Sequence, residues 1–450
     1  MKIKSNRHFV SAVCIASIFY SASSMAADAF DFNSPWLLGD WGGYRNELSE
    51  NGMDFFLNYS NEAASNIGGG YNSHSTVDYS DQTVAILNYD LNKTDNVNGV
   101  FSVAISNRNN KNLLNNNRLN DPRGTLTEQS QEIWGGGSVT RLARLTYLQR
   151  ANILGQNFSL RVGKMSPAED FFPTSCEFQS LMNCGTVPGI SGIWYGWPVA
   201  SWSAVTTWNI TPDLYIRTGV YQKNPSDNTN ARAQSLSFKG GTGEIYPTLI
   251  GWTPRWGSNN LAGNYFIGVA YSNVNGYDVY EGASGGAEAL NPDKGYKQHN
   301  NKLSAWARFE QQVTGHSGDQ PQGLTLFVNG VLNDKSTTVL QYAYGGGLYY
   351  RGPFESRPDD LIGLASTWVK INSRWSKNRA IANSLSGISD YDNPAYIPPG
   401  SGSLTTEIFY RWQATDWISF QPNLQYYHSP GGVKNVPDAW VVGLRSSITF

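Results

Sequence analysis

Apolar and polar residues alternate along many segments of this chain, with the period of two that is typical of extended strands. The final segment shows the pattern clearly. Small or polar residues such as Arg445 and Ser447 take one face, and the other face carries Trp440, Val442, Leu444, Ile448 and Phe450. Beyond the first 26 residues, no stretch reaches the ~18 consecutive apolar residues of a membrane-spanning helix. The pattern therefore predicts an all-β chain.

Sixteen such segments are predicted, at residues 53–61, 77–92, 98–108, 141–151, 157–164, 199–209, 212–223, 243–252, 262–272, 300–312, 322–332, 338–350, 360–372, 402–414, 416–428 and 438–450. Alternation alone does not separate a soluble sandwich from a membrane barrel. The even count, the strand lengths near ten residues and an export signal favour the barrel. We predict a closed 16-stranded antiparallel transmembrane β-barrel over residues 53–450, with a short N-terminal helical segment.

The first 26 residues have the composition of a cleaved signal peptide. Lys2, Lys4 and Arg7 precede an apolar run over residues 9–20, and small residues lead to a cleavage site before Ala27. Residues 27–52 are predicted to form a periplasmic segment, in which Asp40 caps a short helix that ends near Asn51. An ordered tail without a place in the barrel mouth is the alternative.

Composition and charge exclude some functions. Aromatic residues make up 13% of the chain and there are 46 glycines, a composition typical of a large β structure with many turns. The formal charge of -2 becomes -5 when the three basic residues of the signal are removed, so no basic surface for nucleic acid is expected. Cleavage also leaves an even pair of cysteines, Cys176 and Cys184, which predicts a disulfide in an exported protein. A metal site is disfavoured, because no histidine lies near that pair.

Five short motifs are distributed through the chain: 40–45 (DWGGYR), 160–172 (LRVGKMSPAEDFF), 219–225 (GVYQKNP), 322–327 (QGLTLF) and 422–432. In this order, over residues 36–450, they resemble the OprB-type carbohydrate-selective porins. The resemblance implies a sixteen-stranded channel in the bacterial outer membrane that admits monosaccharides such as glucose by facilitated diffusion. It implies no cofactor and no catalysis. The expected partners are small sugars, outer-membrane lipid and lipopolysaccharide, and the barrel-assembly machinery through the strand ending at Phe450; oligomerisation is left open.

Several polar residues are candidates for lining the pore. Strand parity turns seven side chains toward the lumen: Arg161, Arg217, Trp306, Arg308, Glu310, Glu407 and Arg411. Arginine forks and carboxylates would bind sugar hydroxyls, and the Trp306 indole would stack on a sugar ring. The long segment 165–197 is predicted to fold inward and narrow the pore, with Glu169 and Asp170 near the eyelet. The alternatives are a charge network that only holds loops in place, and a loop that only caps the barrel.

A second function remains open from the residues alone, that of an exported β-rich carbohydrate-binding protein or glycoside hydrolase. Such a hydrolase needs a convergent pair of carboxylates, which a sequence does not locate. The motif at 282–286 (GASGG) fits a nucleophile elbow but lacks the strand–turn–helix context, so no catalytic residue is assigned.

Overall fold

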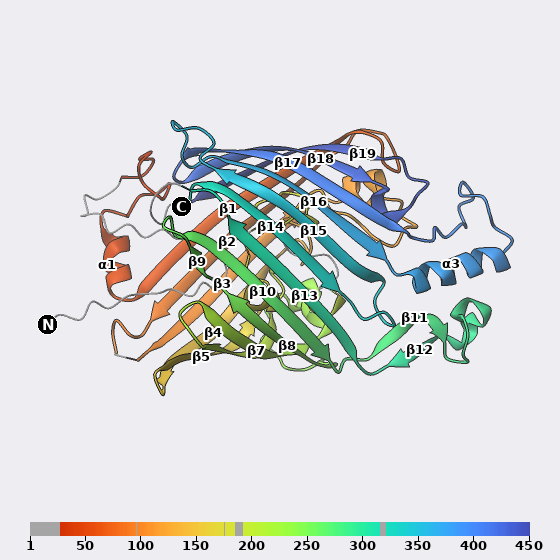
Figure 1. Cartoon of the computed structure of the whole chain (residues 1–450), viewed down its shortest axis with the longest axis horizontal. Helices are drawn as coiled ribbons and strands as arrows, with labels where there is room; N and C mark the ends of the chain where they lie inside the picture. The colour runs from red at the N-terminus through yellow and green to blue at the C-terminus, as the bar shows by residue number, and fades with distance from the viewer. Residues whose placement is uncertain (1–27, 96, 175, 185–191, 316–320) are drawn as a thin grey trace.

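Antiparallel strands close into one barrel in this protein (Figure 1). The structure is a computed structural model that describes residues 28–95, 97–174, 176–184, 192–315 and 321–450. The predicted signal peptide and its cleavage site lie outside the described residues. Of the nineteen strands in the described ranges, sixteen form the closed wall, β9 is a two-residue strand paired with the end of β10, and β11 and β12 form a separate two-stranded sheet. The predicted fold class is confirmed.

The sixteen wall strands are β1 (Met53–Gly68), β2 (Val77–Asp90), β3 (Gly99–Asn110), β4 (Val139–Ile153), β5 (Gln156–Met165), β6 (Ser201–Asn209), β7 (Leu214–Lys223), β8 (Gly243–Trp252), β10 (Leu261–Ser272), β13 (Lys302–Gln312), β14 (Gly323–Leu332), β15 (Leu340–Arg351), β16 (Leu361–Ile371), β17 (Gly402–Thr415), β18 (Ile418–His428) and β19 (Ala439–Thr449). Strand β9 (Arg255–Trp256) extends a turn beside β10, and β11 (Gly276–Gly282) pairs with β12 (Tyr296–His299) in a loop. The helices are α1 (Tyr44–Glu50), α2 (Pro167–Phe171) and α3 (Ser373–Leu385).

The barrel closes where its first and last strands meet. β1 pairs with β2 on one side and with β19 on the other, in a register that sets Asn58 opposite Thr449 and Glu62 opposite Arg445. Closure leaves the wall without an open edge of unpaired backbone groups. All sixteen predicted segments overlap these strands, but the predicted end of the first one was wrong, because β1 continues from residue 61 to Gly68.

The two ends of the barrel differ in their connections. Turns at one end are short, such as residues 154–155, 210–213 and 416–417, and α1 lies there (Figure 1). Long loops leave the other end, where Figure 1 shows α3, β11 and β12. Bacterial barrels have short periplasmic turns and long extracellular loops, which assigns the end with α1 to the periplasm.

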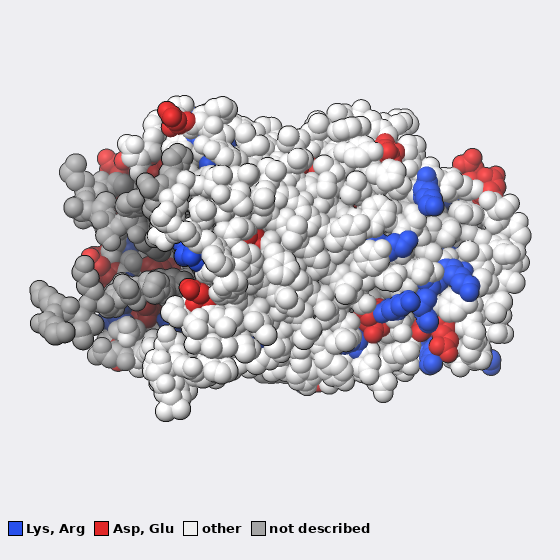
Figure 2. All heavy atoms as spheres, in the orientation of Figure 1, with Lys and Arg blue, Asp and Glu red and all other residues white. Residues whose placement is uncertain are grey.

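The outer face of the wall is apolar. Leu87, Ile105, Ile250, Val328 and Ile408 each expose more than two fifths of their surface. Figure 2 shows almost no charged side chains across the middle of the visible face, whereas lysine and arginine gather near the extracellular end. A lipid-facing band has this composition. Among the described residues, no helix is both long and apolar enough to span a bilayer.

Helix α1 begins later than the sequence predicted. Its N-cap is Gly43, whose φ of 91° suits glycine, so the expected cap at Asp40 was wrong. Asp40 instead accepts a hydrogen bond from the Gly43 amide at 2.9 Å, which stabilises the turn before the helix.

Helix α1 also connects the N-terminal segment to the barrel seam. The Arg45 guanidinium is 5% exposed and lies 4.2 Å from the ring centre of Trp36 and 4.6 Å from that of Trp41. It donates a hydrogen bond of 3.0 Å to the main-chain oxygen of Phe450, just beyond β19. Arg45 therefore joins the beginning of the described chain to its last strand.

Candidate functional site

Two long loops lie inside the barrel. In the segment 166–200, the side chain of Gln179 donates to the Ala63 oxygen of β1 at 3.1 Å, although the segment leaves the wall at β5. In the segment 111–138, the side chain of Gln131 donates to the main-chain oxygen of Glu62 at 2.7 Å. Residues 185–191 of the first segment lie outside the described residues. That segment 111–138 also enters the lumen was not predicted from the sequence.

Helix α2 holds the first of these loops against the wall. Its N-terminus has Pro167 at the first helical position and a capping box between Ser166 and Glu169, which favours a helix start at this point. Asp170 then pairs with Arg161 of β5, and its main-chain oxygen accepts from Arg217 of β7 at 2.5 Å. Burial would raise the pKa of Asp170, but these two arginines hold it below its usual value, so the carboxylate stays ionised.

Two further contacts fix α2. Glu169 accepts two hydrogen bonds from Arg144 of β4, at 2.6 and 2.9 Å. The Trp306 indole of β13 donates to the Phe171 oxygen at 2.8 Å and packs edge-on against Trp194 at 5.2 Å between ring centres. Trp306 is only 2% exposed, so in this structure its rings are covered by the loop instead of facing the water of the lumen.

The tip of the same loop rests on β17. The carboxylate of Glu407 is fully buried and accepts from the Gln179 amide at 2.8 Å and the Ser180 amide at 2.6 Å. Next to it, the ring of Phe178 packs against Phe409 at 5.1 Å and Phe327 at 6.1 Å between centres. The tip is thus held by two charge-assisted hydrogen bonds and an aromatic cluster.

The disulfide predicted from the sequence joins Cys176 and Cys184 on either side of this tip. The Glu132 carboxylate approaches both sulfur atoms, but disulfide sulfur offers no thiolate to a metal ion.

Two predicted pore residues remain partly exposed. The Arg411 side chain is 19% exposed and donates to the Glu177 carboxylate at 2.6 Å and to the Gln421 amide oxygen at 2.7 Å. The Glu310 side chain is 21% exposed and accepts from Arg308 at 2.5 Å. Arg308 itself is buried beneath that carboxylate, over the Phe327 ring.

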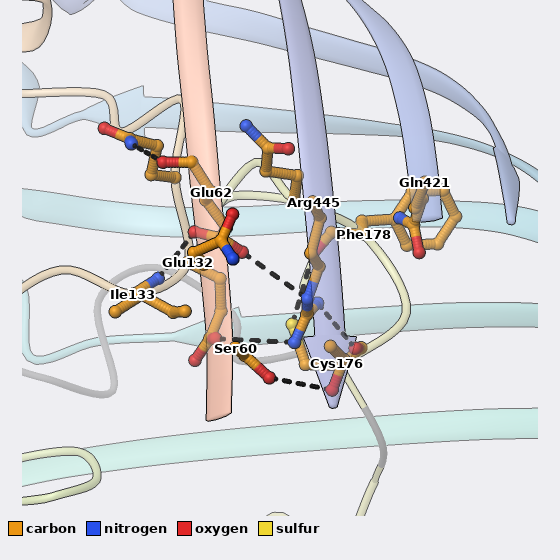
Figure 3. Close-up of polar contacts among 12 residues, drawn as sticks. Ser60, Glu62, Glu132, Ile133, Cys176, Phe178, Gln421 and Arg445 are labelled. Carbon is orange, nitrogen blue, oxygen red and sulfur yellow. Dashed lines mark hydrogen bonds and ion pairs between the residues drawn. The ribbon is translucent and has the colours of Figure 1, made fainter. Parts of the chain in front are cut away.

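A second charged group, which was not predicted from the sequence, lies beside Arg411 and Glu177 on the inner wall (Figure 3). Arg445 of β19 lies 3.7 Å from the Glu62 carboxylate and 3.9 Å from the Glu132 carboxylate, and it donates to the Cys176 oxygen at 3.3 Å. Parity had placed Arg445 on the polar face, so its strand position was a usable signal. Glu62 lay one residue beyond the predicted end of β1, and nothing in the sequence places Glu132 in the lumen.

Strand register explains why these groups meet. Pairing sets Glu62 beside Arg445, and Arg445 beside Gln421, on three neighbouring strands. Gln421 then bonds to Arg411 on the next strand. One row of donors and acceptors therefore follows the inner wall, and residues 132 and 176–177 of the two loops face it.

A cavity of about 440 Å³ opens beside this row. Its lining includes Arg411, Gln421 and Arg445, as well as Asn58 and Ser447 near the periplasmic ends of β1 and β19. The volume falls within the range of ~300–1,000 Å³ that is typical of small-molecule sites.

Comparison with known proteins gives consistent similarities. The family model described as "Carbohydrate-selective porin, OprB family" matches residues 74–450. The chain is 37% identical to "Porin B" of Pseudomonas aeruginosa, over 97% of this chain and 96% of that protein. It is 33% identical to "Putative porin QuiX" of Acinetobacter baylyi, over 99% and 100%. A structure titled "High pH structure of Pseudomonas putida OprB" is 38% identical and superimposes with a TM-score of 0.90, over 94% of this chain and 100% of that one.

Proposed function

The chain belongs to the carbohydrate-selective porin OprB family and is an outer-membrane sugar channel, not an enzyme; we propose that it admits small sugars, monosaccharides such as glucose, through a charged eyelet. We define the charged eyelet by the facing side chains of Glu62, Glu132, Glu177, Arg411 and Arg445. The inward segment 165–197 narrows the lumen at this level.

The observation that carries the proposal is the position of the eyelet charges beside open space. Side chains of Glu132, Glu177, Arg411 and Arg445 are 15–20% exposed, and three of these residues line the 440 Å³ cavity. Partly exposed arginines and carboxylates retain donors and acceptors for the hydroxyl groups of a passing sugar. Selectivity in such a pore comes from its width and from the hydrogen-bonding groups that line it.

Pairing of opposite charges suits a neutral solute. Arg445 lies near Glu62 and Glu132, and Arg411 contacts Glu177. Each cation thus has a nearby anion, which weakens the field that would select ions of one sign. What the eyelet offers is a set of directed hydrogen bonds, which an uncharged polyhydroxylated molecule uses well.

The other sequence-predicted residues take a supporting role in this proposal. Six of them are at most 8% exposed: Glu169 and Asp170 belong to the inward loop, and Arg161, Arg217, Trp306 and Glu407 bond to it from the wall. They hold the loop that shapes the eyelet. Glu310, with Arg308 beneath it, is proposed to line the lumen on the opposite wall.

The proposal extends to the surroundings of the barrel. Figure 2 shows lysine and arginine side chains gathered near the extracellular end. Lys294, Lys297 and Lys377 are exposed in the long loops of that end and would attract the phosphates of lipopolysaccharide. β19 is proposed as the strand that the barrel-assembly machinery recognises.

Liposome swelling tests the sugar channel and its eyelet. Purified protein is reconstituted, and uptake is compared for glucose, a disaccharide and sorbitol, an open-chain polyol of similar size. We expect uptake of glucose to exceed that of sorbitol, and the Arg411→Gln, Arg445→Gln double variant to lose this preference by about 2- to 10-fold, the equivalent of one hydrogen bond.

Arg255→Gln is the matched control, since Arg255 is exposed on β9 at a periplasmic turn outside the lumen. The control should keep the preference for glucose. Uptake graded by size alone in the unaltered protein would refute selection by the eyelet.

A further inference from the structure

The cavity on the periplasmic side of the charged eyelet has apolar as well as polar lining. Beside its polar groups it is lined by the apolar side chains Phe56, Val84, Ile86, Ile133 and Trp197, of which Ile133 and Trp197 come from the two inward loops. A cavity with both kinds of lining fits a ligand that has apolar faces and a polar edge.

Trp197 is held rigidly in this lining. Its indole N–H donates to the Gln82 side-chain oxygen at 3.1 Å, and that oxygen also accepts from Arg108 at 2.6 Å. The ring packs against the cluster that contains Val84 and Ile86. Trp197 is nevertheless only half-buried, and the rest of its surface lines the cavity. The ring is therefore oriented by the protein before any solute arrives.

The neighbouring strands β1 and β19 present hydroxyl and amide groups to the same cavity. Asn58 donates to the Ser447 hydroxyl at 3.0 Å, and the hydroxyls of Ser60 and Ser447 lie 2.9 Å apart. Gln421 of the polar row lines the same space. Hydroxyls both donate and accept, so these groups can exchange their internal bonds for bonds to a solute.

We propose that this cavity is a pyranose-binding subsite on the periplasmic side of the eyelet, in which Trp197 stacks on the apolar C–H face of the sugar ring. The polar groups of Asn58, Ser60 and Ser447 bind the hydroxyl edge. This inference rests on the proposed function, because the eyelet must first admit the sugar. It adds a step in which a closed sugar ring is distinguished from an open chain.

Ring shape is the basis of the discrimination. A glucopyranose ring with equatorial hydroxyls exposes flat patches of C–H groups on its faces, and a flat aromatic surface covers them well. Sorbitol has the same hydroxyl chemistry but no rigid face, so it gains little from Trp197. The subsite thus adds discrimination by ring shape to the discrimination that the eyelet makes by hydrogen bonds.

The test is a glucose titration of ion conductance through single channels in planar bilayers. A sugar that occupies the lumen reduces the current, and the half-saturating glucose concentration reports binding. We expect Trp197→Leu to raise this concentration about 5- to 10-fold, as loss of one aromatic contact predicts, and Trp197→Phe to raise it less. The effect of sorbitol should be the same in all three proteins.

Trp208→Leu is the control, since Trp208 is exposed on the outer face, stacked on Phe158 at 5.8 Å between ring centres. It should leave the glucose titration unchanged. Heat-modifiable mobility on gels verifies that each variant is folded, and Trp197→Met replaces Trp197→Leu if the latter does not fold.

Two negative results are distinguishable. An unchanged half-saturating concentration in folded Trp197→Leu, while the double eyelet variant loses glucose preference, overturns the subsite and leaves the proposed function standing. Absence of glucose preference in the unaltered protein overturns the proposed function itself, and the subsite with it.

Discussion

The anchor at Glu407 provides a sharp test of how the inward loop controls the pore. Glu407 is buried in β17, and its two oxygens accept from the amides of Gln179 and Ser180 at 2.8 and 2.6 Å. The change Glu407→Gln preserves size but replaces one acceptor oxygen with an NH₂ group. One of the two loop amides then faces a donor, so its hydrogen bond is lost.

The magnitude follows from the environment of these bonds. A hydrogen bond to a charged group contributes about 1.5–3 kcal/mol, and a buried donor without an acceptor costs about 1–3 kcal/mol. We therefore expect Glu407→Gln to weaken the attachment of the tip to β17 by about 2–4 kcal/mol, allowing for partial relaxation. Since each 1.4 kcal/mol is a factor of ten, the detached fraction of the tip rises roughly 30- to 1,000-fold.

Single-channel conductance and the dependence of liposome uptake on solute size measure this detachment. We expect larger and noisier single-channel currents in Glu407→Gln, and faster liposome uptake of a disaccharide relative to glucose. The barrel itself should remain folded, because the hydrogen bonds between its strands are untouched. Glu355→Gln, at an exposed periplasmic loop position, is the control and should behave like the unaltered protein.

One outcome would refute the reasoning. If folded Glu407→Gln has the same current and the same size limit as the unaltered protein, the tip is held well enough by Phe178 and the disulfide, and Glu407 does not control the pore.

Two other contacts make separate predictions. Arg45→Ala removes a buried guanidinium that contacts two tryptophans and bonds to the main chain after β19. We therefore expect the barrel to unfold at a lower temperature, measured on gels as the temperature at which the folded band is replaced by the unfolded band, and Arg45→Lys to lose less. Asp278 of β11 receives two hydrogen bonds from Arg374 of α3. Burial would raise the pKa of Asp278, but backbone amides together with Arg374 and His299 lower it to about 2. A depressed carboxylate pKa stabilises the fold above its ordinary value near 3.8 and ceases to do so as pH falls toward 2. Pepsin should therefore cut loop 273–301 increasingly between pH 4 and pH 2, and in Asp278→Asn this pH dependence should be absent.

Most of the fold was predictable because alternation is a local signal. A strand with one face toward lipid and one toward the lumen records both environments in its own sequence. The extension of β1 over residues 62–68 was not predicted, because its sequence, Glu-Ala-Ala-Ser-Asn-Ile-Gly, has mostly small and polar residues on both faces. Its strand conformation comes from pairing with β2 and β19, which the segment itself does not record.

The site was less predictable, because parity gives the direction of a side chain but not what fills the space before it. Trp306 and Glu407 are buried on the lumen side of the wall, where parity placed them, yet loop residues cover both. Arg445 has the same parity and is left partly open. The difference depends on the path of two loops, which is set by contacts far apart in sequence.

Those long-range contacts also determine when the eyelet is complete. Its loop residues, Glu132 and Glu177, come from the first half of the chain, whereas Arg411 and Arg445 belong to the last strands. Glu62 meets Arg445 only through the pairing of β1 with β19, the contact that closes the barrel. The loops therefore have no full set of partners until the wall is closed. The complete set of eyelet contacts thus forms only in the closed barrel, in which β19 is paired with β1.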